Sequence, residues 1–229
     1  RQFHIYIYNK DKIYESYNSL IREKTTIKDI GKIDKETSNE FGFLLNGISE
    51  KELILGKKIR LSNFFLNNLF MNSRGAIYQK YLTPTKKYKS DLKAIGGKQI
   101  GRYLIKENVK GFIAKNIVND NKAVIKPNSI LVQRIVAHIE RPREHIVIMA
   151  SSSDIIDCNE NIVVDTINQL TPRTKINSLL FLAILNSKLM SWYAYRFIFG
   201  KAIRAMSFDN PVSANFPIPK NIDKKQDTN

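Results

Sequence analysis

Short apolar segments alternate with polar turns along most of the chain, a pattern typical of a β-rich fold. β-Branched and aromatic residues are frequent in these segments, as expected of half-buried strands. A short apolar run at Phe3–Tyr8 predicts one more strand near the start of the chain. The segments predicted as strands in the main part are Ala76–Leu82, Gln99–Lys106, Ser129–Ile139, His145–Ala150 and Asn161–Ile167.

The first fifty residues differ from the β-rich part, because after the first predicted strand their sequence predicts helices and a loop. Residues 12–24 have the apolar spacing of an amphipathic helix, and residues 24–40 are polar enough to form a loop. Ser49 and Glu52 match a capping box at the start of a short helix. We expect Gly56 to end that helix.

Two helices in succession are predicted near the C-terminal end. Thr171 can cap the first helix, with Pro172 at its first position. Asn186-Ser187 interrupts the apolar run and can cap a second helix, which Gly200 ends. The segment Phe216–Pro219 is expected to be extended, because its two prolines exclude a helix.

These patterns indicate a mixed α/β fold of the α+β class, rich in strands, with two C-terminal helices and an extended proline-rich tail. We expect an appendage or linker to an upstream domain over residues 1–50, a main domain over residues 51–219 and a disordered tail over residues 220–229. The chain of 229 residues is 43% hydrophobic and can bury a sizeable core. Its longest apolar run, Leu179–Leu185, is far shorter than the roughly 20 residues of a membrane span, so no membrane partner is expected.

The distribution of positive charge gives a first indication of function, because the excess is concentrated in one segment. The chain carries 37 Lys and Arg residues against 21 Asp and Glu residues, a formal net charge of +16. Half of that excess, +8, lies in residues 74–110, which also hold several tyrosines. Nucleotide bias in a genome can enrich lysine, but it would spread the excess more evenly. A segment of this kind is typical of a protein that binds a polyanion.

Candidate catalytic and metal-binding residues are sparse. No histidine has a second His or Cys at helical spacing, so we expect no metal site, and the single Cys158 fits the reducing cytoplasm. Gly96-Gly97-Lys98 lacks the Ser or Thr of a phosphate-binding loop and predicts a tight turn. The main carboxylate cluster consists of Asp154, Asp157, Glu160 and Asp165, and it leaves a metal-dependent nuclease that uses Asp154, Asp157 or Glu160 as an alternative.

Six short sequence motifs occur in a fixed order along the chain. Each motif alone is common in proteins, but their order together is typical of one family. They comprise an apolar stretch before an Arg-Gly turn, a Gly-x-x-Ile-x-Arg-Tyr pattern, a Leu-Val-x-Arg strand, a later strand, a helix with Leu-Asn-Ser-Lys-Leu, and Pro-Ile-Pro. These segments are Ile59–Phe65 with Ser73–Gly75, Gly97–Tyr103, Leu131–Arg134, Asn161–Ile167, Leu185–Leu189 and Pro217–Pro219. In this order the chain resembles the TaqI-like C-terminal specificity domain, the target recognition domain of Type IIG restriction–modification enzymes and related adenine-N6 DNA methyltransferases.

The resemblance implies a domain that lies against double-stranded DNA and reads a short target in the major groove. It implies no catalytic activity and no cofactor in this fragment. The parent enzyme would use S-adenosylmethionine, with or without magnesium, in an upstream methyltransferase domain that flips the target adenine. The chain starts at Arg1, so we expect it to be a piece of a longer polypeptide. It has no Pro-Pro pair of the methyltransferase motif, so we expect this fragment to be catalytically silent.

The residues expected to contact DNA lie in the charge-dense segment, near the predicted Arg141–Glu144 hairpin connection, or just beyond the second C-terminal helix. A solvated surface is the alternative for each lysine, and bracing of the fold is the alternative for Arg102 and Tyr103. For the whole chain, half of a Type I restriction specificity subunit and an RNA-binding role also remain open. The candidates are Arg74, Lys80, Lys98, Gln99, Arg102, Tyr103, Lys106, Arg134, Arg141, Arg143, Lys201 and Arg204.

Overall fold

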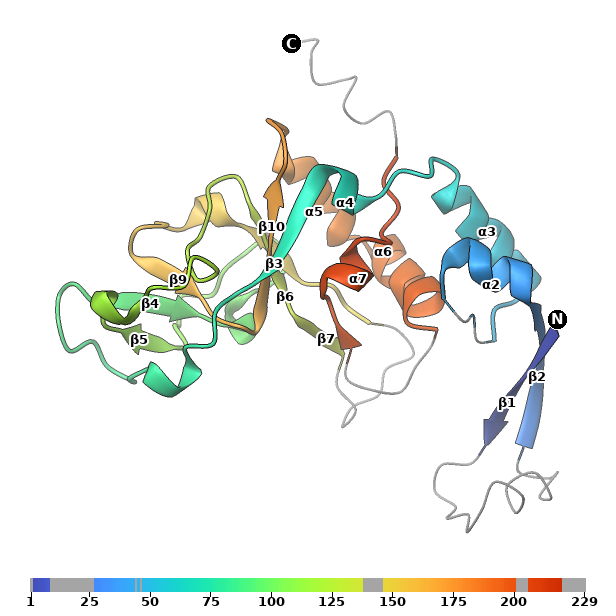
Figure 1. Cartoon of the computed structure of the whole chain (residues 1–229), viewed down its shortest axis with the longest axis horizontal. Coiled ribbons are helices and arrows are strands. Elements are labelled where there is room, and N and C mark those ends of the chain that lie inside the picture. Colours follow the sequence, from blue (N-terminus) through green and yellow to red (C-terminus); the bar gives the residue numbers. More distant parts are fainter. Residues whose placement is uncertain are drawn as a thin grey trace.

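A computed structural model of the chain describes its conformation outside a few short segments. Helices and short strands alternate along it, and most strand pairs are antiparallel, which confirms the predicted mixed α/β class (Figure 1). Within this part of the chain, no helix has the length and apolar character needed to span a membrane. The described residues are 2–8, 27–43, 45, 47–137, 146–200 and 206–219.

The centre of the molecule is an antiparallel sheet of four strands. The apolar residues of its inner strand β6 are fully buried, because both faces of that strand are covered. The predicted strand over residues 129–139 is confirmed as two successive strands, β6 and β7 (Ile135–Ala137), and residues 138–139 lie outside the described part. The strand order is β3 (Phe70–Arg74), β10 (Ile167–Pro172), β6 (Ile130–Gln133) and β8 (Ala150–Ser152).

A second, smaller sheet forms the lobe at the left of Figure 1. Its middle strand β4 (Leu92–Ile95) pairs antiparallel with β5 (Gly111–Ile113) and parallel with β9 (Asn161–Val163). Strand β9 ends only a few residues before β10 begins, so a short turn at Asp165-Thr166 carries the chain from one sheet to the other. This turn lies at the junction of the two sheets.

Two helices cover the central sheet, as the apolar run in this region predicts. The ring of Phe181 on α5 (Ser178–Leu185) packs edge-on against Phe70 of β3 at a centroid distance of 5.2 Å. Asn186-Ser187 separates α5 from α6 (Lys188–Tyr193), which confirms the predicted interruption. The Ser187 hydroxyl accepts a hydrogen bond from the Met190 N–H at 3.1 Å and so caps α6.

The N-terminal part begins with an antiparallel strand pair and continues into two helices (Figure 1). Strands β1 (Gln2–Tyr8) and β2 (Ile27–Asp34) form the pair, and α2 (Lys35–Phe41) follows directly. The predicted strand at residues 3–8 is confirmed. The Phe41 ring stacks on Phe197 at 4.9 Å, so α2 shares the hydrophobic core of the C-terminal helices.

Helix α3 (Glu50–Arg60) has the predicted capping box but not the predicted end. The Ser49 N–H donates to Glu52 at 2.9 Å, and the Ser49 hydroxyl accepts from the Glu52 N–H at 3.3 Å. Gly56 lies inside the helix, which continues to Arg60, and a Cβ at this position would come within 2.3 Å of the Phe197 ring. Its role is close packing, and the prediction that it ends the helix is wrong.

Several predicted segments adopt another structure. Residues 24–40 are not a loop throughout, because β2 and α2 occupy residues 27–41. Residues 76–82 form no strand but contain a 3-10 turn at Gln79–Tyr81. The strand β10 pairs instead with β3, which precedes this segment. Residues 99–106 form a loop with a bridge between Ile100 and Ile105, because Tyr103 has a φ of 64° and breaks the extended backbone.

The predicted start of the first C-terminal helix is also wrong. Thr171 and Pro172 continue β10, because the ladder with β3 extends to the pair Pro172–Phe70. Pro172 stands at the end of that ladder, where its missing N–H is tolerated. Helix α5 begins six residues later, and the Asn177 side chain caps it by accepting from the Leu179 N–H at 3.0 Å.

The remaining predictions concern strand ends, a tail and segments outside the described residues. Strand β8 starts at Ala150, so residues 146–149 lie before the strand and not in it. The segment at residues 216–219 is extended, as predicted, and Pro217 forms a bridge with Phe65. The predicted helix over residues 12–24, the hairpin connection at 141–144 and the tail over 220–229 lie outside the described residues.

Candidate nucleic-acid interface

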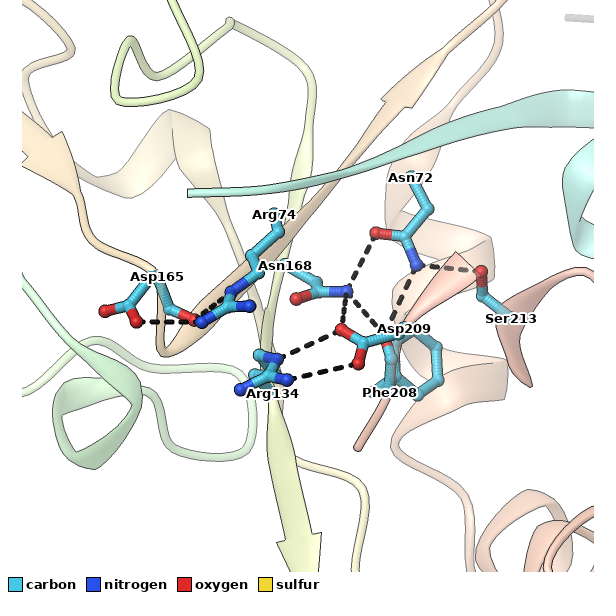
Figure 2. A network of polar contacts seen from close by, with 8 residues as sticks. All are labelled: Asn72, Arg74, Arg134, Asp165, Asn168, Phe208, Asp209 and Ser213. Carbon is cyan, nitrogen blue, oxygen red and sulfur yellow. Dashed lines mark hydrogen bonds and ion pairs between the residues drawn. The ribbon is translucent and has the colours of Figure 1, made fainter. Parts of the chain in front are cut away.

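Arg74 is held by a carboxylate from the turn that joins the two sheets. It ends β3, and its guanidinium donates from Nε to the Asp165 carbonyl at 3.0 Å and from Nη2 to Asp165 Oδ2 at 2.9 Å (Figure 2). Gln79 donates to the other carboxylate oxygen of Asp165. The Asp165 side chain is 13% exposed and the Arg74 side chain 42% exposed, so the acid is buried beneath an accessible guanidinium.

Arg134 is held in the same way by a second acid. It follows β6, and its Nε and Nη2 donate to the two carboxylate oxygens of Asp209 at 3.0 and 3.3 Å. Its backbone N–H donates to the Thr166 carbonyl at 3.0 Å, which places it against the same turn as Arg74. Within the described part of the chain, Nη1 of both arginines has no hydrogen-bond acceptor, so the Nη1/Nη2 edge of each has no protein partner there, with the Arg74 side chain 42% exposed and the Arg134 side chain 21% exposed.

Buried amides fix the second of these acids. Asn168 on β10 is 1% exposed and donates to the Phe208 carbonyl at 2.6 Å, to Asn72 at 3.1 Å and to Asp209 at 3.4 Å. Asn72 in turn donates to the Ser213 hydroxyl at 2.8 Å. Figure 2 shows two separate groups of contacts: Arg74 is held by Asp165, and Arg134 is held by Asp209, which the Asn168 amide also contacts.

Thr166 of the same turn also lines a hollow of about 460 Å³. Gly96-Gly97, which the sequence predicts as a tight turn, begins a 3-10 turn at Gly97–Gln99 and forms one wall. Lys98 and Lys110 both line the hollow, together with Gln133 and Thr166. Burial lowers the pKa of Lys110, the Asp165 carboxylate partly opposes this and the nearby Lys98 lowers the pKa further. The two ammonium groups therefore share a region that favours an anion.

A cluster of exposed lysines lies in the loop between η1 (Gln79–Tyr81) and β4. Asp91 is buried and accepts hydrogen bonds from the N–H groups of Lys87 and Tyr88 at 2.9 and 3.0 Å, which shapes this loop. The side chains of Lys86, Lys87 and Lys89 point into solvent. Among the described residues, no acid forms an ion pair with these three lysines, so their charge is available to a partner.

Two of the predicted contact residues have structural partners. Gln99 is 6% exposed, and its side chain accepts a hydrogen bond from the Gly96 N–H at 3.1 Å, so it closes the glycine turn from inside. Arg102 donates from Nη2 to the carbonyl of Asn186 at the C-terminal end of α5. A cation is favourable there because it interacts with the helix dipole. This bracing is the alternative that the sequence left open for Arg102.

The other predicted residues are exposed but differ in setting. The Lys80 ammonium lies 5.0 Å from the centroid of the Tyr81 ring, and Lys106 lines a separate shallow hollow. Tyr103 is 51% exposed, and its N–H donates to the Ala150 carbonyl at 2.9 Å. None of these three shares the turn at Asp165-Thr166. The predicted Arg141, Arg143, Lys201 and Arg204 lie outside the described residues.

The acidic residues considered for a nuclease have separate roles. Asp154 accepts from the Asn128 N–H at 2.7 Å, and Asp157 accepts from the Asn159 N–H at 2.8 Å. Glu160 forms an exposed ion pair with Lys93 at 3.8 Å. Over the described residues, no three His, Cys, Asp or Glu side chains gather closely enough to hold a metal ion.

The sequence did not predict which residues order the site, and it offered Asp165 only as a member of the carboxylate cluster. Asp165 lies 91 positions from Arg74, and Asp209 lies 75 positions from Arg134, so no local spacing connects either pair. Asn168 and Thr166 are ordinary strand and turn residues in the sequence. Lys110 was visible only as one member of the charge-dense segment. A comparison with protein-family models finds no model that matches the chain, and a comparison with curated proteins finds no match.

Proposed function

We propose that this chain binds double-stranded DNA and reads a short sequence through the face around the Asp165-Thr166 turn. The observation that carries the proposal is the pair of arginines, Arg74 and Arg134, each fixed by its own carboxylate with one edge left open. Further lysines, Lys98 and Lys110, line the hollow beside this turn, and an exposed lysine cluster lies in the loop before β4, at the end of that strand away from the turn. Fixed guanidiniums suit base recognition, whereas mobile lysines suit phosphates.

The geometry of the guanidinium supports a sequence-reading role over simple charge attraction. An arginine that forks onto guanine O6 and N7 uses two N–H groups in one plane. Because Asp165 and Asp209 take up the Nε side of Arg74 and Arg134, the Nη1/Nη2 side is held ready in a defined direction. Holding the side chain in advance lowers the entropy that is lost on binding.

The resemblance to TaqI-like specificity domains supports a place for this module in a restriction–modification polypeptide. In that setting an upstream methyltransferase domain of the same chain, with S-adenosylmethionine, would modify the adenine, and this module would position the duplex in the cytoplasm. The fragment itself would supply recognition and no catalytic group.

A selection experiment tests sequence reading directly. The 229-residue chain is incubated with a pool of duplexes that share flanks and carry a randomised centre, and the bound fraction is sequenced after several rounds. The proposal predicts enrichment of one short motif. Arg74→Ala should then lower affinity for that motif by about 1–3 kcal/mol and relax the preference at one base pair.

The control is Arg173→Ala. Arg173 is exposed and donates from Nε to the Asn67 carbonyl at 2.9 Å, away from the turn, so its removal should leave the motif unchanged. A pool that returns without enrichment, from a folded chain that still binds duplex, would reject sequence reading. Preferential binding of single-stranded RNA would instead favour the RNA-binding alternative.

A further inference from the structure

The hollow beside the glycine turn is lined by both positively charged and apolar side chains. A surface that binds only phosphate would not need the apolar ones. Lys98 and Lys110 supply positive charge at its edge, and the aliphatic side chains of Val109 and Ile135 supply apolar wall. The Gln133 side chain also faces the hollow, and its amide has no hydrogen-bond partner among the described residues. The volume of about 460 Å³ falls within the range of roughly 300–1,000 Å³ that is usual for small-molecule sites.

The glycine pair is what leaves this space open. A Cβ on Gly96 would lie 2.7 Å from Cδ of Lys110, and a Cβ on Gly97 would lie 2.7 Å from the Thr166 carbonyl and 3.3 Å from Cγ of Gln133. Gly96 therefore permits the Lys110 side chain to cross the turn, and Gly97 permits the close approach of Thr166. The pair, which matches no known loop motif, has a steric role that is specific to this hollow.

The polar groups of the hollow can bind both ends of a nucleotide. The Thr166 hydroxyl accepts from the Gly97 N–H at 2.9 Å, which leaves its own proton free for a phosphate oxygen beside the two ammonium groups. A glutamine amide can pair with a base edge through one donor and one acceptor. The Asp165 carboxylate, the acid that acts on Lys110, is itself bound by Arg74 and Gln79, so its repulsion of a phosphate is reduced.

We infer that this hollow is a binding site for a single nucleotide unit, with the phosphate between Lys98 and Lys110 and the base between Val109 and Ile135, facing Gln133. The unit can come from a free nucleoside monophosphate or from a nucleotide displaced from a DNA duplex. Only the second source rests on the proposed DNA-binding function. The lowered pKa of Lys110 agrees with this site, because a bound phosphate would compensate an ammonium that burial disfavours.

The test uses the 229-residue chain and 2′-deoxyadenosine 5′-monophosphate as the probe. Backbone amide resonances of Gly96 and Gly97 report on the hollow by NMR, and calorimetry gives the affinity. We expect these resonances to shift with the nucleotide, and affinity to fall at least about tenfold for either deoxyadenosine or inorganic phosphate alone. Inorganic phosphate that binds as tightly as the nucleotide would overturn the assignment, because the hollow would then be only an anion site.

Two variants separate a ligand role from a structural one. Lys110→Gln should weaken nucleotide binding about tenfold, whereas Lys115→Gln, which removes an exposed lysine outside the hollow, should not. Gly96→Ala should fold, since the nearest atom it displaces belongs to a flexible lysine, and it should weaken binding by moving Lys110. Unchanged nucleotide affinity in both Lys110→Gln and Gly96→Ala would overturn the inference.

Competition identifies the source of the nucleotide and keeps the two proposals separate. Displacement of the probe by a duplex with one mismatched, extrahelical adenine, but not by the perfect duplex, supports a nucleotide taken from DNA. Binding of the probe with no competition from either duplex supports a free nucleotide. If neither the probe nor the mismatched duplex shifts Gly96 and Gly97, the inference fails. Duplex binding measured by anisotropy on the same samples then shows whether the proposed function fails with it.

Discussion

At the scale of single residues, the arginines differ in the group that binds their guanidinium. Arg74 and Arg134 look similar to Arg102 in the sequence, but their partners differ in kind. Carboxylates hold the first two with an edge left open, while Arg102 donates to a carbonyl at a helix end. We therefore expect Arg102 to stabilise the fold and the other two to contact DNA.

Arg102→Ala tests this division. It should lower the free energy of unfolding by about 1 kcal/mol, because the Asn186 carbonyl loses a charged donor. Duplex affinity should fall no more than for the loss of any one surface charge. Denaturant unfolding and fluorescence anisotropy on the same variant measure both quantities. A stable variant that has lost its preference among duplexes would show that Arg102 reads a base after all.

Asp209→Ala tests how the second arginine is held. Removal of the carboxylate leaves the Arg134 guanidinium, 21% exposed, without its acceptors, so we expect a loss of about 1–3 kcal/mol in unfolding free energy. Glu160→Ala removes an exposed ion pair with a side chain 64% accessible, and its effect should stay below about 0.5 kcal/mol. Equal effects in the two variants would mean that Asp209 is an ordinary surface acid.

At the scale of elements, local signals account for what the sequence predicts correctly. The capping box at Ser49 and Glu52 and the break at Asn186-Ser187 depend on residues within one helical turn of each other. Their side chains satisfy backbone groups that any helix end exposes, so their meaning does not depend on the rest of the fold. Such signals can be read from sequence alone.

Elements that depend on distant partners could not be predicted in this way. The segment 76–82 has strand-like composition, yet its neighbour Phe70–Arg74 is the one that pairs with β10, nearly a hundred residues later. The same ladder overrides the cap and proline signal at Thr171 and Pro172. Pairing between distant strands, and the burial that comes with it, decides these cases over local propensity.

Gly56→Ala separates local propensity from packing in α3. Alanine is a better helix former by about 1 kcal/mol, which alone would stabilise the protein. The new methyl would come within 2.3 Å of the Phe197 ring, and such overpacking costs about 1–3 kcal/mol. We expect a net decrease in thermal stability, while Lys58→Ala on the exposed side should change it little. A more stable Gly56→Ala variant would show that Phe197 moves away without cost.

At the scale of the whole molecule, part of the basic segment at residues 74–110 folds around the turn at Asp165-Thr166. The sequence locates +8 of the net +16 in residues 74–110. Folding brings part of that segment, including Arg74, Lys98 and Lys110, around one turn between two sheets. It also turns Gln99 inward and adds Arg134 from another strand, which composition could not show.

The most direct test of the central claim is the salt dependence of duplex binding. Fluorescence anisotropy of a short labelled duplex gives the affinity of the 229-residue chain over a range of salt concentrations. If about five phosphates are contacted, the slope of log affinity against log salt should be roughly −4.5. Replacement of Lys87, Lys98 and Lys110 by glutamine should make it shallower by about 2.7. A flat response, or an unchanged slope in the triple variant, would contradict the account.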